Sequence, residues 1–221
     1  MSAMNPRLTG IGMTSQRTRV RMIERLRQQG IQDEVVLTSM REIPRHIFVD
    51  DALASRAYED CSLPIGFAQT ISSPYTVARM SELARSGKPL KKVLEIGTGC
   101  GYQTAVLSRL ATEVYTVERI GPLLARARRK LVELKCSNVR TQHADGSQGF
   151  PDAGLFDCIL LTAAATHFPQ DLLDHLEIGG RMVAPLGSEE QHLYLIERTP
   201  QEFKETCLES VKFVPLLPGL S

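Results

Sequence analysis

The segment VLEIGTGCGYQT, at residues 93–104, restricts the possible folds of this chain more than any other part of it. β-Forming residues end at Ile96, glycines follow at positions 97, 99 and 101, and helix-forming residues begin at Tyr102. Glycine accepts positive φ angles and has no side chain, so a ligand can lie directly against the backbone. The start of the following helix adds free N–H groups and positive potential. Open α/β sheets bind ligands at turns of this kind, after the carboxyl end of a strand.

The rest of the chain supports the same class of fold. After residue 91, apolar β-rich runs alternate with segments of helical periodicity, which indicates a right-handed, mostly parallel sheet. The last strands have no helices between them, so an antiparallel hairpin is expected there. We therefore predict an α/β fold, a Rossmann-like doubly wound sheet with a C-terminal antiparallel hairpin and an N-terminal helical extension. The expected strands are 93–96, 114–117, 139–143, 156–161, 181–186, 192–197 and 208–214, and the expected helices are 102–110, 123–134 and 169–176.

The N-terminal part is expected to be helical, apart from residues 46–73. That stretch shows no clear periodicity and indicates a long loop, which in compact domains is usually functional or disordered. We predict one compact domain, in which residues 1–90 form a helical and substrate-loop region and residues 91–221 form the cofactor-binding core. The three N-terminal helices are predicted over 15–29, from an N-cap at Asp33 to Pro44, and from an N-cap at Ser73 to about Gly87.

The composition excludes several classes of protein. The chain has 221 residues, of which 43% are hydrophobic and 23% charged, and these values are too apolar for a disordered chain. No run approaches the roughly 18 apolar residues of a membrane helix, and the N-terminus lacks the apolar part of a secretory signal. The formal net charge of +1 gives no argument for nucleic acid.

Charged and sulfur-containing residues add further expectations. The first thirty residues contain six arginines and one glutamate, and residues 126–130 form a second basic cluster. Both are predicted to be solvated helix faces, and contact with an acidic partner is the alternative for the first. The five cysteines include no CxxC pair, which indicates a reducing, cytoplasmic compartment. The histidines have no metal-ligand spacing, so no metal is expected.

The spacing of the glycines distinguishes between possible ligands. A dinucleotide-binding turn follows the pattern GxGxxG, whereas the third glycine here is Gly101 and Tyr102 takes the next position. The pattern GxGxG, with Glu95 two residues before it, looks like the S-adenosylmethionine loop of class I methyltransferases. The acidic side chain of Glu95 would attract the cationic amino-acid part of that cofactor, directly or through water, and would repel a pyrophosphate.

Two more acidic residues follow the next strands. Glu118, 21 residues after Gly97, ends the second strand, where a carboxylate can accept both hydroxyls of a ribose. Asp145 and Gly146 follow the third strand, in a position to meet the edge of an adenine. The alternative is that Glu118 and Asp145 merely cap the helices that follow them.

Longer stretches resemble one family in particular. LPIG at 63–66 and QTIS at 69–72 precede the glycine loop, and FVPL lies at 213–216. Over nearly the whole chain, the sequence is similar to the protein-L-isoaspartate O-methyltransferase family. That family transfers a methyl group from S-adenosylmethionine to the free α-carboxylate of L-isoaspartyl residues in damaged proteins, and leaves S-adenosylhomocysteine. The resemblance implies protein repair through a succinimide, with isoaspartyl proteins and peptides as partners.

The resemblance also implies a role for individual residues. Ser72 of QTIS would be the active-site serine, whereas the residues alone favour a cap or turn serine before Pro74. The implied cofactor-binding residues are Gln69, Thr70, Ile71, Ser72, Glu95, Gly97, Thr98, Gly99, Glu118, Arg119, Asp145 and Gly146, and the implied substrate-binding residues are Pro64, Ile65, Gly66, Ser72 and Val214.

The sequence departs from the family's usual pattern at three places. Ser73 stands where many members have a larger polar residue, residues 165–167 replace a proline-containing stretch, and Cys100 takes a small-residue position. The first two lie near the site entrance and affect peptide preference rather than the reaction.

Other functions remain as alternatives. A class I methyltransferase for a different small carboxylate or for nucleic acid has the same glycine loop, and a non-catalytic binder has the same fold. Against nucleic acid, LTAA at 161–164 lacks the Pro-Pro-aromatic motif with which amino-methylating enzymes hold a flipped base. We expect a monomer without nucleic-acid or membrane partners.

Overall fold

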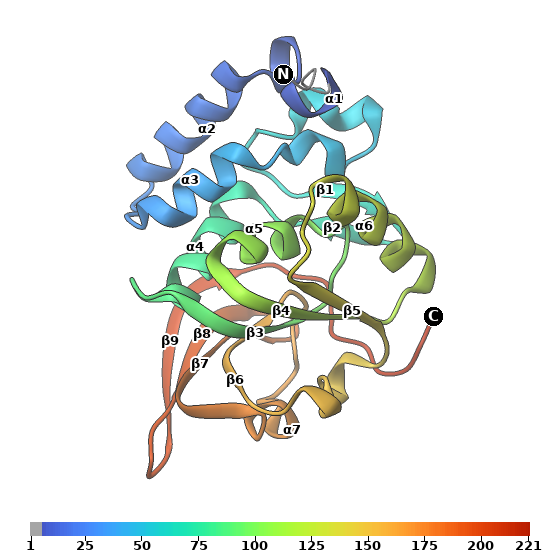
Figure 1. The fold of residues 1–221 in the computed structure, drawn as a ribbon. Coiled ribbons are helices and arrows are strands. Elements are labelled where there is room, and N and C mark those ends of the chain that lie inside the picture. Colours follow the sequence, from blue (N-terminus) through green and yellow to red (C-terminus); the bar gives the residue numbers. More distant parts are fainter. Residues whose placement is uncertain (1–5) are drawn as a thin grey trace.

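A seven-stranded sheet forms the centre of the computed structural model, which describes residues 6–221 (Figure 1). Neighbouring strands pair in parallel across the first five positions, and the last two pairs are antiparallel. This arrangement confirms the predicted Rossmann-like sheet and its C-terminal antiparallel region. In spatial order the strands are β5 (Val139–His143), β4 (Ala111–Glu118), β3 (Leu90–Ile96), β6 (Phe156–Leu161), β7 (Leu176–Gly187), β8 (Gln191–Arg198) and β9 (Phe203–Val211).

Helices and turns cover both faces of the sheet, so the protein has two hydrophobic clusters. Adjacent side chains of a strand point to opposite faces, and accordingly Val93 of β3 belongs to one cluster and Leu94 to the other. Burial on both faces is typical of parallel strands. The first face is covered by α4 (Pro74–Arg85), α5 (Tyr102–Leu110) and α6 (Gly121–Glu133), and the second by α7 (Gln170–Leu173) and the 3₁₀ turns η4 (Gly146–Gln148) and η5 (Pro151–Ala153) (Figure 1).

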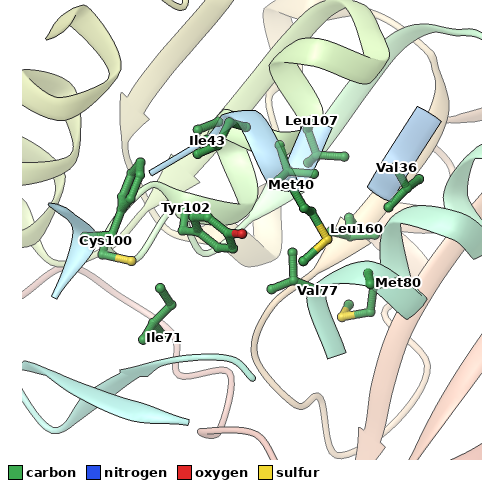
Figure 2. Close-up of a cluster of buried hydrophobic side chains, with 14 of the residues drawn as sticks. Val36, Met40, Ile43, Ile71, Val77, Met80, Cys100, Tyr102, Leu107 and Leu160 are labelled. Carbon is green, nitrogen blue, oxygen red and sulfur yellow. The ribbon is translucent and has the colours of Figure 1, made fainter. Parts of the chain in front are cut away.

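A further helical layer lies over α4, α5 and α6 (Figure 1). Its Met40 and Ile43 side chains belong to the same buried cluster as Val77 of α4 and Tyr102 of α5 (Figure 2). The N-terminal region and the sheet region therefore share one hydrophobic cluster. The layer consists of α1 (Pro6–Thr9), η1 (Gly12–Thr14), α2 (Gln16–Gln28) and α3 (Glu34–Glu42).

Two predicted helix starts are confirmed by their capping bonds. Oδ1 of Asp33 accepts the backbone N–H of Val35 at 2.9 Å, and Oγ of Ser73 accepts that of Thr76 at 3.2 Å. Oδ2 of Asp33 also accepts Nε of Arg85 at 2.8 Å. One largely buried carboxylate side chain therefore starts α3 and joins it to the end of α4.

The prediction of one long loop over residues 46–73 is wrong. The stretch contains 3₁₀ turns and a two-stranded antiparallel hairpin that is separate from the main sheet. Elements of three to six residues are too short to show a detectable periodicity in the sequence. They are η2 (Arg45–Phe48), η3 (Asp51–Arg56), β1 (Leu63–Gly66) and β2 (Gln69–Ile71).

The last strand also differs from its prediction. It was expected over 208–214, but β9 ends at Val211. The ladder stops there because the side-chain amide of Gln191, rather than a strand backbone, forms hydrogen bonds with the backbone of Phe213. Its Oε1 accepts the N–H of Phe213 at 2.7 Å, and its Nε2 donates to the carbonyl at 3.1 Å. Val214 therefore lies beyond the strand.

The helices are short. The longest, α2 and α6, have 13 residues each, and no helix within residues 6–221 is long and apolar enough to cross a lipid bilayer. The helix predicted over 169–176 ends at Leu173, because Leu176 already pairs with Phe156 of the neighbouring strand.

The prediction of solvated basic faces is wrong for Arg19, and Arg25 is only partly exposed. Arg19 is 1% exposed, and its guanidinium donates to the backbone carbonyls of Leu8, Thr9 and Glu42. In the second cluster, Lys130 is only partly exposed, whereas the three arginines of residues 126–129 are exposed as predicted. Arg19 can be buried because backbone carbonyls of other helices accept its N–H groups. The periodicity of its own helix gives no information about those carbonyls, so the burial could not be predicted.

The turn of the β1–β2 hairpin generates a stability prediction. Phe67 and Ala68 both have φ near +54°, and this left-handed conformation costs a non-glycine residue about 1–2 kcal/mol. Replacing Ala68 by glycine removes that strain, so A68G is expected to raise the free energy of unfolding by about 1 kcal/mol in urea denaturation. The control is A125G, at an exposed position inside α6, which should lower it by about 1 kcal/mol. An A68G protein no more stable than the wild type would contradict the prediction.

Candidate active site

A cavity lies at the carboxyl end of the central strands. Its walls are the glycine loop (residues 97–101), the end of the β1–β2 hairpin and the C-terminal tail (residues 212–221). It contains about 910 Å³ of space between atoms, part of it open to solvent. Segments far apart in the sequence therefore meet where the glycine pattern predicts a ligand.

The glycine loop forms one wall of the cavity. Gly97, Gly99 and Gly101 have φ angles of +97°, +56° and +90°, in the left-handed region that favours glycine. A Cβ at position 97 would lie 2.3 Å from Oγ1 of Thr162, so no side chain fits there. The Thr162 hydroxyl donates to the Gly97 carbonyl at 2.5 Å. This bond ties the loop to the residue that follows β6.

Glu118, at the end of β4, supports the loop from the next strand. Its Oε2 accepts the N–H of Gly99 at 2.8 Å, and its Oε1 accepts that of Ile120 at 2.9 Å. An ionised carboxylate has roughly four acceptor positions, so acceptor capacity remains for a ligand. Because Glu118 also lines the cavity, it can hold the loop and accept hydroxyl groups at the same time.

Glu95 lies beneath the loop rather than in the cavity. Its side chain is fully buried, and its Oε2 accepts the hydroxyls of Thr104 and Thr116 at 2.5 and 2.6 Å. Its Oε1 has no hydrogen-bond partner among the described residues. Burial raises the pKa of Glu95 to about 8, against the opposing effect of the two hydroxyl bonds. At pH 7 the group is a neutral acid, so the predicted attraction of a cofactor cation requires loss of that proton and stays a prediction.

Ser72 lies just after β2 and lines the cavity. The next residue, Ser73, provides the cap of α4, so the capping role proposed as the alternative for Ser72 belongs to its neighbour. The backbone carbonyl of Ser72 accepts Nη2 of the buried Arg45 at 2.6 Å. The bond from Arg45 thus fixes the main chain of Ser72 at the edge of the cavity.

The C-terminal tail closes the cavity beside the ends of three strands. The N–H of Leu216 donates to the carbonyl of Ala164 at 2.7 Å, beyond β6. The N–H of Gly219 donates to Oδ2 of Asp145 at 2.6 Å, and this bond is the main cause that lowers the pKa of Asp145. Nε of Arg119 donates to the carbonyl of Gly219 at 3.0 Å. Two residues predicted to contact the cofactor therefore also hold the tail.

The structure brings most of the predicted residues to this cavity. Glu95 and Asp145 lie outside its lining, Ile65 packs against the glycine loop, and Pro64 and Gly66 are exposed at the hairpin. The individual binding roles stay predictions. The predicted residues that line the cavity are Gln69, Thr70, Ile71, Ser72, Gly97, Thr98, Gly99, Glu118, Arg119, Gly146 and Val214.

Sequence inspection missed other parts of the lining. Val77 and Met80 of α4 and Tyr102 of α5 border the cavity and also belong to the buried cluster in Figure 2. Their spacing resembles that of any helix core, so it carries no signal of a site. Nothing in the sequence marks Leu217 as a cavity residue either. Thr162 could have been identified as one, because it is a polar residue directly after an apolar strand.

Comparisons with known proteins agree with this geometry. The chain matches the family "Protein-L-isoaspartate(D-aspartate) O-methyltransferase (PCMT)" over residues 17–220. The chain belongs to this family. A protein-L-isoaspartate O-methyltransferase of Methylobacillus flagellatus is 63% identical, over 96% of this chain and 97% of its own length. Its counterpart in Nitrosomonas europaea is 60% identical, over 98% of each chain.

Solved structures show the same fold. One protein-L-isoaspartate O-methyltransferase superposes with a TM-score of 0.83 and 26% identity, and the match covers 91% of this chain and 67% of the other. A putative protein-L-isoaspartate O-methyltransferase from Plasmodium falciparum, crystallised with S-adenosyl-L-homocysteine, has a TM-score of 0.76 and 24% identity. That match covers 89% of this chain and 97% of the other.

Members of the family use S-adenosylmethionine, and the residues of this cavity fit that cofactor. Glu118 offers acceptors for ribose hydroxyls. A Cβ at Gly146 would lie 2.5 Å from Cγ2 of Ile96, so the backbone there lies too close to the sheet for any side chain. Ile120 and Leu216 add apolar surface on which a planar base can stack. Within the described residues, no cluster of three or more His, Cys, Asp or Glu side chains could hold a metal ion.

The buried acid under the loop predicts an unusual pH dependence of stability. In the unfolded chain Glu95 ionises near its ordinary pKa of 4.5, whereas in the folded protein it stays protonated until about pH 8. Between these values the folded state binds the extra proton, so this group makes the wild type less stable as pH rises. Glu95→Gln removes the titration.

We therefore expect the stability of E95Q relative to wild type to rise by roughly 1.4 kcal/mol per pH unit between about pH 5 and 8. Urea denaturation of both proteins at several pH values measures it, and other titrating groups cancel in the difference. A difference independent of pH would mean that Glu95 is ionised in the folded protein.

Proposed function

We propose that this chain transfers the methyl group of S-adenosylmethionine to the free α-carboxylate of L-isoaspartyl residues in damaged proteins and peptides. The reaction takes place in the cavity described above. The ester then closes to a succinimide, and hydrolysis of that ring restores some normal aspartyl residues. The observation that carries the proposal is the meeting of Ser72 with the glycine loop and Glu118 in one cavity, in a member of this family.

The chemistry suits the polar but uncharged surroundings of Ser72. A free α-carboxyl has a pKa of about 3.5, so the attacking oxygen is ionised at neutral pH and needs no general base. The bound cofactor supplies a methyl group on a positively charged sulfur. The protein's part is to align the carboxylate with that methyl group and to exclude water. We propose that the Ser72 hydroxyl donates a hydrogen bond that orients the carboxylate without protonating it.

The hairpin and the tail would hold the substrate peptide. β1 pairs only with β2 among the described strands, so its other edge can form main-chain hydrogen bonds with an extended peptide. We propose contacts with Pro64, Ile65 and Gly66 on this side and with the backbone of Val214 on the other. Val214 lies beyond β9 and borders the cavity, which supports this placement.

The remaining proposals concern where and with what the chain acts. We propose that it works as a monomer in the cytoplasm, without nucleic-acid or membrane partners. All five cysteines are unpaired in the structure, which agrees with a reducing compartment. The net charge of +1 supplies no general attraction for nucleic acid.

The role of Ser72 is tested by Ser72→Ala. We expect kcat for an isoaspartyl peptide to fall about 100-fold, because a carboxylate misplaced by about 1 Å loses that much, while the affinity for S-adenosylmethionine stays the same. The control is Ser73→Ala, which removes the cap of α4. It should cost about 1 kcal/mol of stability and leave kcat unchanged. An S72A enzyme with the kcat of wild type would refute the catalytic role.

The substrate class is tested by the product. Purified protein is incubated with radiolabelled S-adenosylmethionine and an isoaspartyl peptide, the same peptide with normal aspartate, a small carboxylic acid or RNA. We expect base-labile methyl ester only on the isoaspartyl peptide, because its carboxylate extends from a kinked backbone that the other substrates lack. Equal labelling of the aspartyl peptide or of the small acid would overturn the proposal.

A further inference from the structure

A buried guanidinium lies directly behind Ser72. Arg45, in η2, has no exposed surface. Its Nε donates to the carbonyl of Ala57 at 2.7 Å, and its Nη2 donates to the carbonyl of Ser72 at 2.6 Å. Its Nη1 has no hydrogen-bond partner among the described residues. One side chain therefore links the start of the 46–73 segment to its end at the cavity.

This positive charge has no negative partner within residues 6–221. Arg45 takes part in none of the ion pairs there. The ionisable groups with the largest effect on it are Tyr58, Tyr102 and two cysteines, all of types that are uncharged at neutral pH. Its guanidinium lies 4.8 Å from the ring centre of Tyr102, which lines the cavity.

Such an arrangement is unfavourable in the protein alone. A buried charge without a counter-ion loses its hydration, and the two carbonyl bonds and the Tyr102 ring offset only part of that loss. Burial lowers the pKa of Arg45, yet a guanidinium stays protonated in proteins. The unpaired Nη1 adds the cost of an unsatisfied donor. The protein therefore holds, next to its cavity, a charge that an incoming anion would stabilise.

We propose that the carboxylate of the substrate is the missing counter-charge, and that Arg45 is a positioning residue that fixes Ser72 and attracts that carboxylate. This inference rests on the proposed place of the carboxylate at Ser72. Arg45 acts through the Ser72 main chain and through space, and does not contact the attacking oxygen. A direct clamp on that oxygen would stabilise the ground state more than the transition state, since the oxygen loses its charge during transfer.

Arg19 provides a matched control. It is also a buried arginine of the N-terminal region, and it also donates to backbone carbonyls, those of Leu8, Thr9 and Glu42. None of the carbonyls that Arg19 bonds lies in the 46–73 segment that ends at Ser72. A purely structural effect of losing a buried guanidinium should appear equally in Arg19 and Arg45 variants, whereas an effect on the substrate's charge should appear only in Arg45 variants.

The experiment measures peptide binding by calorimetry to the full chain loaded with S-adenosylhomocysteine. The variants are R45K, R45Q and R19Q, and the melting temperature and cofactor affinity of each are recorded. Two peptides are compared, one with the isoaspartyl carboxylate and one in which that carboxylate is converted to the neutral amide. The ratio of their dissociation constants isolates the effect of the substrate's charge.

We expect wild type, R45K and R19Q to prefer the carboxylate peptide by about tenfold, as one unit charge at close range allows. R45Q should bind the two peptides about equally, with unchanged cofactor affinity. R19Q should have a lower melting temperature and no other change. A carboxylate preference in R45Q equal to that of wild type would overturn the inference.

The proposal stays testable if R45Q does not fold. Equal affinity of the wild-type protein for the two peptides would by itself overturn it. The result is also separable from the proposed function. Loss of kcat in S72A together with an unchanged preference in R45Q rejects only the role of Arg45, whereas unchanged kcat in S72A rejects the catalytic role of Ser72.

Discussion

The contact between Gly97 and Thr162 is the constraint on which the cavity depends. Because Gly97 has no side chain, the Thr162 hydroxyl reaches its carbonyl at 2.5 Å and joins the ends of the two central strands, β3 and β6. The turn that follows brings the N–H of Gly99 to Glu118, which joins the end of β4. Three strand ends are thereby held together beneath the cavity. A larger residue at position 97 would displace the loop from all of them.

Burial gives residues of the same type different properties around this cavity. Glu118 reaches the cavity and keeps acceptors for a ligand, whereas Glu95, two strand positions before the loop, is sealed beneath it as a neutral acid. On the other side, Arg45 is buried against carbonyls rather than carboxylates. A carboxylate with free acceptor capacity thus lines the cavity, and an unpaired positive charge lies beside the main chain of Ser72.

Much of the fold was predictable because it follows from local chemistry. Asp33 and Ser73 cap helices in the way their sequence context indicates, and β5 and β6 occupy the predicted residues. The hairpin within 46–73 was not predicted, because its strands are too short to show periodicity. The end of β9 was missed because the side chain of Gln191 terminates it from another strand. The cavity residues of α4 resemble ordinary core residues, so only the structure shows that they border a site.

The sequence by itself determined the strand, glycine turn and helix at residues 93–104, the order of strands and helices after residue 91, and the resemblance that points to the chemistry. These features depend on neighbours a few positions apart, where propensity and capping act. The tertiary structure alone decided that Arg45 bonds the main chain of Ser72, that the tail is held by Asp145, and that burial raises the pKa of Glu95. The partners in the first two contacts are separated by 27 and 74 residues. Burial and pKa depend on the groups that surround a side chain in space, and a local sequence pattern does not show which groups those are.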